Sequence, residues 1–409
     1  MAQAASIPTA DSLYPHETSN VLRLSVAQAL AGSNAVVAYA TGAIVGNSLA
    51  PSSALATLPI SIFVVGMAVC TLPFGALARR HGRRAAFLTG TGCGVLTGLL
   101  SSLAVVLGSF WLFSLAMAFG GAYAAVVLSL RFAAADCAPA DRRPRAMSAV
   151  MAGGVFAGVI GPQLVTLTMN WSPPHLFAAT YIAQAGVAVV SALVLMGVRL
   201  PKPTLAESAQ GRPLGVILRQ PRFINAVVCG VVSYLLMNFI MTAAPLAMHL
   251  CGLPQEASNL GLQWHVIAMY APSFFTGRLI ARFGAPRMTS AGLALIAAAA
   301  GVGLTGVEVA HFWGSLILLG VGWNFGFLGA SALVLECHRP EERTRVQSLN
   351  DFFVFGTMAV GSFASGGLLS AFGWNVVLLV SFVPLLIAAT FLTVTAMQRS
   401  ASPQQSSST

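Results

Sequence analysis

Six long stretches with almost no charged side chains divide the sequence. Three contain no Asp, Glu, Lys or Arg and three contain one acid each: residues 24–78, 85–130, 146–198, 223–277 (Glu256), 288–335 (Glu308) and 346–398 (Asp351). A helix that crosses a bilayer needs about 20 apolar residues, so each stretch can hold two helices and a short turn. Within lipid the backbone must satisfy its own hydrogen bonds, as helices do. The pattern predicts an all-α membrane protein with twelve transmembrane helices.

Composition excludes several other classes of protein. Charged residues make up 8% of the chain and hydrophobic residues 56%, whereas soluble globular proteins have about 25% charged residues. The net charge of +10 comes from short basic clusters between apolar stretches, so we expect no nucleic-acid partner. The six cysteines show neither a disulfide framework nor a metal-ligand spacing, so we expect no metal site and no cofactor.

The basic residues are distributed unevenly among the expected loops. The turns inside the six stretches contain no Lys or Arg; they are residues 47–53, 108–109, 170–175, 252–258, 307–311 and 371–374. We assign all 21 Lys and Arg residues to the five other loops or to the two ends, at Arg23 and Arg399. Basic loops stay in the cytoplasm. The prediction is a multi-pass protein of the cell inner (plasma) membrane with both termini cytoplasmic.

Two kinds of loop recur about 200 positions apart. The segment 75–82 and the segment 277–284 have the same glycine spacing, and a second pair of loops places an acid seven positions before an arginine, Asp136 with Arg143 and Glu336 with Arg343. This repeat predicts two six-helix bundles in parallel orientation. The expected organisation is a cytoplasmic tail (1–22), an N-terminal bundle (23–198), a cytoplasmic linker (199–222), a C-terminal bundle (223–398) and a cytoplasmic tail (399–409).

These loops carry a resemblance to a known family. The first loop is similar to the G-x-L-a-D-R-x-G-R-R/K signature of the major facilitator superfamily, with Arg79 where the usual aspartate stands; the matching residues are Gly75, Leu77, Arg80, Gly82, Arg83 and Arg84. The acid–arginine loops resemble those of its sugar porters. The resemblance covers nearly the whole chain and implies secondary transport, in which two bundles rock about a site near the membrane midplane. It does not identify a subfamily.

The same resemblance implies a cytoplasmic gate in which arginines of one half pair with acids of the other. The expected gate residues are Gly75, Arg79, Arg80, Gly82, Arg83, Asp136, Arg143, Glu336 and Arg343. The alternative interpretation of the glycine loops is close helix packing alone, because small residues let helix backbones approach.

A few polar or aromatic side chains lie deep in the expected helices. They are Asn34, Tyr123, Tyr234, Asn238, Trp323 and Asn324, in spans 1, 4, 7 and 10, which line the central cavity in the family. Polar groups facing lipid are costly, so we expect them to face inward and bind substrate. Hydrogen bonding between helices without ligand contact stays open. We expect no Lys, Arg or acid near the midplane, which favours a small neutral or zwitterionic organic solute, aromatic solutes included.

Two titratable residues are expected inside the membrane, His265 and Asp351. Either could carry a coupling proton. A hydrogen-bonded structural histidine is an equal alternative for His265. For Asp351 we favour an acid in the first turn of a helix, where it complements the helix dipole.

The expected function is a monomeric secondary active transporter in the lipid bilayer, coupled to an ion such as the proton and working by alternating access. A proton-coupled efflux pump for amphipathic drugs is an alternative, favoured by Gly158–Pro162 in span 5 and disfavoured by the lack of an acid in spans 1 and 4. A non-transporting receptor or scaffold is an alternative of another class. An enzyme is not expected, because no H-E-x-x-H, G-x-S-x-G or pair of deep aspartates is present.

Overall fold

The computed structural model describes residues 16–52, 55, 57–200 and 211–401, and this part of the chain is helical and contains no strand. The first half comprises α2 (Glu17–Leu49), α3 (Leu58–His81), α4 (Arg83–Leu107), α5 (Phe110–Asp136), α6 (Arg143–Thr168) and α7 (Ala178–Met196). The second half follows the short linker helix α9 (Leu214–Leu218) and comprises α10 (Pro221–Leu250), α11 (Gln255–Tyr270), α12 (Ser273–Phe283), α13 (Ala285–Leu304), α14 (Val309–Leu335), the 3₁₀ turn η2 (Pro340–Glu342), α15 (Arg343–Phe372) and α16 (Trp374–Ala401).

Ten of the described helices are long and apolar enough to cross a membrane. The two remaining span positions are filled by the consecutive helices α11 and α12, which are interrupted at Ala271–Pro272, and by the long helix α15. The prediction of an all-helical membrane protein with twelve spans is confirmed. The first helix begins at Glu17, inside the segment that we expected to be a tail.

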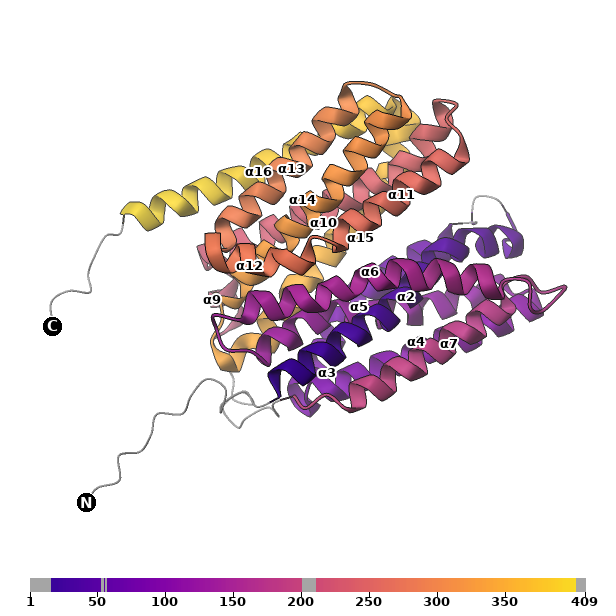
Figure 1. Cartoon of the computed structure of the whole chain (residues 1–409), viewed down its shortest axis with the longest axis horizontal. Helices are drawn as coiled ribbons and strands as arrows, with labels where there is room; N and C mark the ends of the chain where they lie inside the picture. Colours follow the sequence, from indigo (N-terminus) through magenta and orange to yellow (C-terminus); the bar gives the residue numbers. More distant parts are fainter. Residues whose placement is uncertain (1–15, 53–54, 56, 201–210, 402–409) are drawn as a thin grey trace, which may run out of the picture.

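The halves form two bundles that lie side by side (Figure 1). Helix α2 begins and α16 ends at the same end of the molecule, on the left of Figure 1. We call this the basic end, because the arginine-bearing loops 79–84 and 339–345 lie there. The halves contact one another through α3 against α15 and through α6 against α11 and α12.

The repeated glycine loops make matching turns at the basic end. Gly82 separates α3 from α4 with a φ of 86°, and Gly284 separates α12 from α13 with a φ of 87°. Residues with a Cβ rarely adopt this region, so both turns require glycine. The equal geometry of the two turns is the structural counterpart of the sequence repeat.

Candidate functional site

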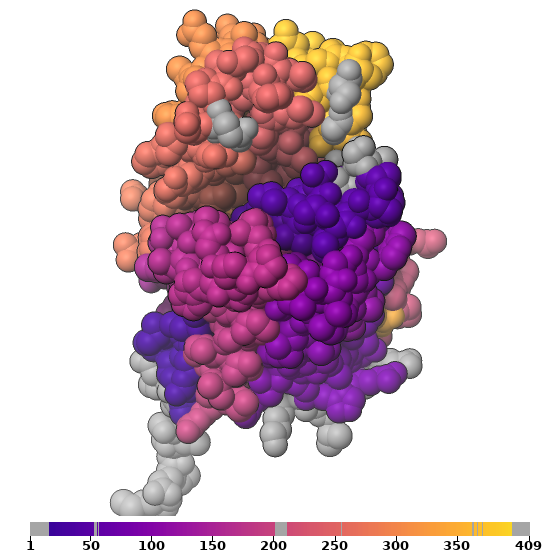
Figure 2. Space-filling model, turned by 90° about the vertical axis from the view of Figure 1, so that its right-hand side faces the viewer, coloured from indigo at the N-terminus to yellow at the C-terminus, as the bar shows by residue number. Residues whose placement is uncertain are grey.

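A cavity lies between the two halves at mid-depth. It has about 890 Å³ of empty space when its open mouth is included. Figure 2 shows the molecule from the end opposite the basic end, where a shaded recess separates the two halves. The described lining comes from α2, α3, α5, α6, α10, α11 and α15, and it contains no charged side chain.

Three kinds of side chain give the cavity its character. The aromatic ones are Tyr39, Phe63, Tyr234 and Tyr270. The methionines are Met67, Met237, Met241, Met269 and Met358, and the amides are Gln28 and Asn238. Aromatic rings and thioethers offer polarizable surface to a flat ligand. The two amides, one on each half, can orient its polar groups.

A second layer of rings holds the cavity tyrosines. The ring centroid of Tyr234 lies 5.5 Å from that of Trp323, 5.1 Å from that of Phe327 and 5.5 Å from that of Phe355, each contact edge-on. Trp323 also contacts Tyr270 at 5.6 Å. Trp323 and Phe327 stack on each other at 5.3 Å. The tryptophan is fully buried behind the cavity wall and is not part of the lining.

Tyr270 reaches the opposite half through a glycine. A Cβ at Gly154 of α6 would collide with the Tyr270 ring, so the close approach of ring and helix requires glycine there. Gly154 and Tyr270 both line the cavity. This contact marks where α11 of the second half meets α6 of the first.

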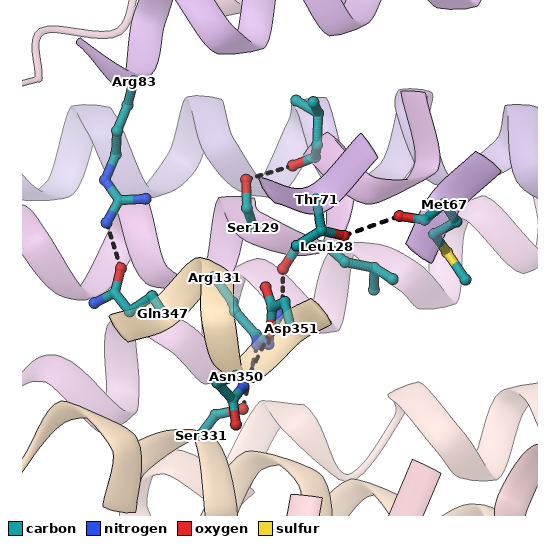
Figure 3. Close-up of polar contacts among 11 residues, drawn as sticks. Met67, Thr71, Arg83, Leu128, Ser129, Arg131, Ser331, Gln347, Asn350 and Asp351 are labelled. Atoms are coloured by element: carbon teal, nitrogen blue, oxygen red, sulfur yellow. Dashed lines mark hydrogen bonds and ion pairs between the residues drawn. The ribbon is translucent and has the colours of Figure 1, made fainter. Parts of the chain in front are cut away.

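A buried ion pair lies between the cavity and the basic end (Figure 3). Arg131 of α5 is fully buried, and its Nη2 lies 2.5 Å from Oδ1 of Asp351 on α15 in the other half. Arg131 Nε also donates to Ser331 Oγ at 3.2 Å, and Asn350 Nδ2 donates to the same oxygen of Asp351 at 3.1 Å. The guanidinium rests on the Phe327 ring at 4.6 Å. A continuous path of contacts therefore joins the ion pair to Tyr234 through Phe327.

Two glycine contacts close the basic end. Gly75 of α3 lies against Ser348 of α15, where a Cβ would collide with the serine side chain. Gly277 of α12 lies against α6, where a Cβ would be 2.6 Å from the carbonyl oxygen of Pro144 and 2.8 Å from Cβ of Ser148. Each contact joins the two halves, and together they repeat the symmetry of the sequence. The basic end is therefore closed, whereas the opposite end is recessed.

An arginine network surrounds the glycine contacts. Arg83 Nη2 lies 2.6 Å from Asp136 Oδ2 within the first half, and the same nitrogen donates to Gln347 Oε1 of the second half. Arg343 of the second half lies 3.9 Å from Asp136. The ion pairs that the structure describes here join Arg83 and Arg343 to Asp136, and Arg79 and Arg80 in the last turn of α3 take no part in them.

The sequence comparisons assign the fold. The family model described as Major Facilitator Superfamily matches residues 24–272 and 226–408. The chain belongs to the major facilitator superfamily. Its relatives include the riboflavin transporter RfnT of Brucella anthropi, 46% identical over 361 residues that cover 88% of this chain and 91% of the relative. An uncharacterized MFS-type transporter of Bacillus subtilis, YddS, is 29% identical, with 84% of this chain and 83% of the relative covered.

Solved structures of this superfamily share the fold. The fucose:proton symporter of E. coli matches with a TM-score of 0.73 at 14% identity, over 93% of this chain and 98% of the symporter. The human organic anion transporter MFSD10 matches with a TM-score of 0.74 at 15% identity, over 92% and 99%. This superfamily member is thus a multi-pass membrane transporter of a small solute and not an enzyme, as predicted.

The structure separates the six expected substrate-binding residues. Tyr234 and Asn238 line the cavity of this superfamily member. The other four lie outside the lining. Asn34 is buried on α2, where its backbone carbonyl oxygen accepts from Gln184 Nε2 of α7, and the Tyr123 ring packs against Gly94 of α4. Trp323 supports the wall from behind, and Asn324 bonds to the interruption between α11 and α12.

The two expected titratable residues differ in their surroundings. His265 is fully buried on α11, and its Nδ1 lies 2.7 Å from the carbonyl oxygen of Leu316 on α14. This bond is the one expected of a structural histidine. The helix-terminus interpretation of Asp351 is wrong, because α15 begins at Arg343 and Asp351 lies in its third turn, paired with Arg131.

Sequence reasoning missed Arg131, which we had assigned to a loop. The expectation of no deep arginine is wrong: α5 continues past Arg131 to Asp136, and the side chain is fully buried. The sequence does contain an indication of it: Asp351, the lone acid inside the stretch 346–398, needs a cationic partner within the membrane. Gln28, Tyr39 and Tyr270 were also missed as lining residues.

Proposed function

We propose that this transporter carries riboflavin, or a flat neutral heteroaromatic solute very like it. The observation that supports the proposal is the uncharged cavity with aromatic and methionine walls, in a chain 46% identical to a riboflavin transporter. The isoalloxazine ring is flat, polarizable and neutral, so it suits Tyr234, Tyr270 and the methionines. Its ring amides and ribityl hydroxyls suit Gln28 and Asn238, one on each half.

The test is riboflavin uptake by a bacterial host that cannot make the vitamin, combined with flavin binding to the purified protein. Flavin fluorescence is quenched when the ring stacks on an aromatic side chain, so binding should quench it. Tyr270→Ala should weaken binding by up to about tenfold, since one aromatic contact is worth about 0.5–1.5 kcal/mol. Tyr181→Phe is the matched control, because Tyr181 is buried in the first half, bonds to Thr41 and does not line the cavity. Equal binding by Tyr270→Ala and the control would place the site elsewhere.

We also propose that transport is coupled to protons at Asp351. The groups that face its carboxylate are Arg131 at 2.5 Å and Asn350 at 3.1 Å, with Arg83 farther off. A small cavity at the closed end is lined by Asp351 together with Arg83 and Gln347. A proton on Asp351 would remove the charge that holds Arg131 and so loosen the two halves.

Asp351→Asn tests the coupling in proteoliposomes. The variant keeps the shape of the carboxylate but cannot lose a proton. It should retain exchange of labelled for unlabelled riboflavin and lose accumulation driven by a pH gradient. Accumulation at the wild-type level would exclude Asp351 as the coupling group, and His265→Gln would then be the next variant to test.

The orientation and assembly belong to the same proposal. We propose a monomer in the inner membrane with the basic end cytoplasmic, in which residues 23–198 and 223–398 move as two rigid bodies. The support is the concentration of arginines at one end. In a variant without its native cysteines, of which Cys251 is exposed, a cysteine placed at exposed Glu308 should react with an impermeant reagent from outside, and one at exposed Asp141 only after the cells are opened. The reverse result would invert the orientation, and with it the direction in which the open cavity faces.

A further inference from the structure

The interruption between α11 and α12 sits between the cavity and the closed end. Tyr270, the last residue of α11, lines the cavity, and Ser273, the first residue of α12, lies at the contact with α6. Pro272 has no backbone N–H, so the helix loses a hydrogen bond at this point. The span therefore consists of two helices joined at Ala271–Pro272: α11 faces the cavity and α12 faces the closed end.

Asn324 of α14 forms hydrogen bonds with both α11 and α12. Its Nδ2 donates to the carbonyl oxygen of Met269 at 2.7 Å, in α11, and to Ser273 Oγ at 2.6 Å, in α12. Its Oδ1 accepts from Thr276 Oγ1 of α12 at 2.7 Å. Asn324 and Thr276 are both fully buried. We call Asn324, Ser273 and Thr276 the clamp.

One clamp residue, Ser273, also takes part in a contact between the halves near the closed end, which we call the gate contact. The carbonyl oxygen of Ser273 accepts a hydrogen bond from Ser148 Oγ of α6 at 2.8 Å, across the two halves. Tyr270, three positions before Ser273, contacts Gly154 on the same helix α6. A change at the Tyr270 ring therefore has two routes to the Ser148 contact, along α6 and through the interruption that the clamp fixes.

The first half has no equivalent of the clamp. Position 124, which corresponds to Asn324 by the repeat, is an alanine that lines the cavity. The corresponding helix α3 runs without interruption from Leu58 to His81, with Pro73 inside it. The polar clamp is thus specific to the second half and does not follow from the shared fold.

We propose that Asn324 and Thr276 are positioning residues that transmit substrate contact at Tyr270 to the Ser148–Ser273 gate contact. The inference rests on the proposed function, because it takes the cavity as the substrate site. With the clamp intact, α11 and α12 keep one angle and move together. Without the clamp, α11 can move while α12 stays in place, so substrate binding is preserved and turnover slows.

Two substitutions at position 276 separate positioning from packing. Thr276→Val keeps the volume and removes the hydroxyl, whereas Thr276→Ser keeps the hydroxyl and removes a methyl group. Thr276→Val and Asn324→Ala should lower the maximal rate of riboflavin transport by about fivefold or more and change the dissociation constant by less than about threefold, as expected for a step after binding. Thr276→Ser should transport at nearly the wild-type rate. If Thr276→Ser transports more slowly than Thr276→Val, Thr276 acts by packing and the proposal is wrong.

The matched control is Thr289→Val. Thr289 is fully buried like Thr276, and its Oγ1 donates to the backbone carbonyl oxygen of Ala285 at 2.9 Å, but the clamp does not include it. This variant should keep the wild-type rate and affinity. Equal slowing in Thr276→Val and Thr289→Val would show a general effect of removing a buried hydroxyl and would overturn the proposal.

A measurement without substrate distinguishes failure of the clamp from failure of the proposed function. Spin labels at positions 141 and 340, in loops of opposite halves at the basic end, report how the gate is held. Thr276→Val and Asn324→Ala should broaden the distance distribution, and Thr276→Ser and Thr289→Val should not. If wild type binds no riboflavin but the distances behave this way, the substrate assignment fails and the clamp stands. Unchanged distances in all four variants would overturn the clamp.

Discussion

At the scale of single residues, the Arg131–Asp351 pair should make a large contribution to stability. Both side chains are buried and come from different halves. Removing one partner of a buried pair leaves an uncompensated charge and costs about 3–5 kcal/mol. Arg131→Gln should therefore lower the free energy of unfolding by about that amount. Thermal unfolding in detergent measures it.

The double variant Arg131→Gln with Asp351→Asn supplies the control. It removes both charges together, so it should be markedly more stable than Arg131→Gln alone. A double variant as unstable as the sum of the two single variants would show that the pair contributes through packing on Phe327 and not through charge.

Trp323 gives a second prediction at this scale. The ring is fully buried and supports Tyr234 and Tyr270 from behind. Trp323→Ala should destabilise the fold by about 3–5 kcal/mol through the void it leaves. Riboflavin binding should weaken as well, because two cavity rings lose their support. Trp323→Phe should retain most of the binding, and flavin quenching measures both variants. Normal stability of the folded Trp323→Ala protein would contradict this role.

The sequence predicts the position of a single side chain when membrane burial alone determines it, and not when a contact with a distant residue does. Tyr234 and Asn238 were predictable, because a polar residue in the middle of a span must face inward. Asn324 obeyed the same rule yet faces a neighbouring helix and not the cavity. Its partners Met269, Ser273 and Thr276 lie about 50 positions away in the chain, so only the tertiary contact decides between cavity and helix.

At the scale of elements, the linker between the halves is fixed to the loop before α15. Arg212 Nε and Nη2 bond to the two carboxylate oxygens of Glu342 at 2.7 and 2.6 Å, and the Arg212 backbone N–H donates at 2.9 Å. These bonds, chiefly from the Arg212 side chain, lower the pKa of Glu342 to about 2. An unfolded glutamate has a pKa of about 4.3. A carboxylate with a lowered pKa stabilises the fold above the unfolded pKa, and that contribution is lost as the pH falls towards the folded pKa.

Because folding lowers the pKa of Glu342, its contribution to stability should be lost only at acidic pH. The difference in stability between wild type and Glu342→Gln should be constant from pH 8 to about 5 and should shrink between about pH 4.3 and 2. Thermal unfolding over this range measures it. Glu341→Gln is the control, since one carboxylate oxygen of Glu341 has no hydrogen-bond partner. A difference that already shrinks between pH 8 and 6 would mean that another group titrates.

Elements were predictable where composition alone determines them. The charge-free stretches located the spans, because lipid excludes charge without regard to tertiary structure. The end of α5 was not predictable in this way. The charge pattern predicts the end of a span at residue 130, but a partner in the other half allows the helix to bury Arg131 and continue to Asp136. The interruption at Pro272 was missed because a proline inside a span also occurs in an unbroken helix, as Pro73 does in α3.

At the scale of the whole molecule, the charge of the cavity should determine which flavin is carried. The described lining contains no charged side chain, and Arg131, one helical turn after the lining residue Leu128, is neutralised by Asp351. Riboflavin is neutral, whereas its 5′-phosphate carries a charge of about −1.5 to −2 at neutral pH. Burying a charge without a partner costs several kcal/mol. Because about 1.4 kcal/mol corresponds to a factor of ten, the phosphate should bind at least about 100-fold more weakly.

Competition against labelled riboflavin measures this selectivity. The neutral 5′-acetate ester is the control, because it adds a group at the same position without the charge. The acetate should compete within about tenfold of riboflavin, which corresponds to about 1.4 kcal/mol. Rejection of both esters would mean that size and not charge limits the ligand. Equal binding of riboflavin and its phosphate would require a cation at the cavity. Arg131 would then have to leave Asp351 when the substrate binds. The charge of the ligand would in that case act directly on the contact between the two halves.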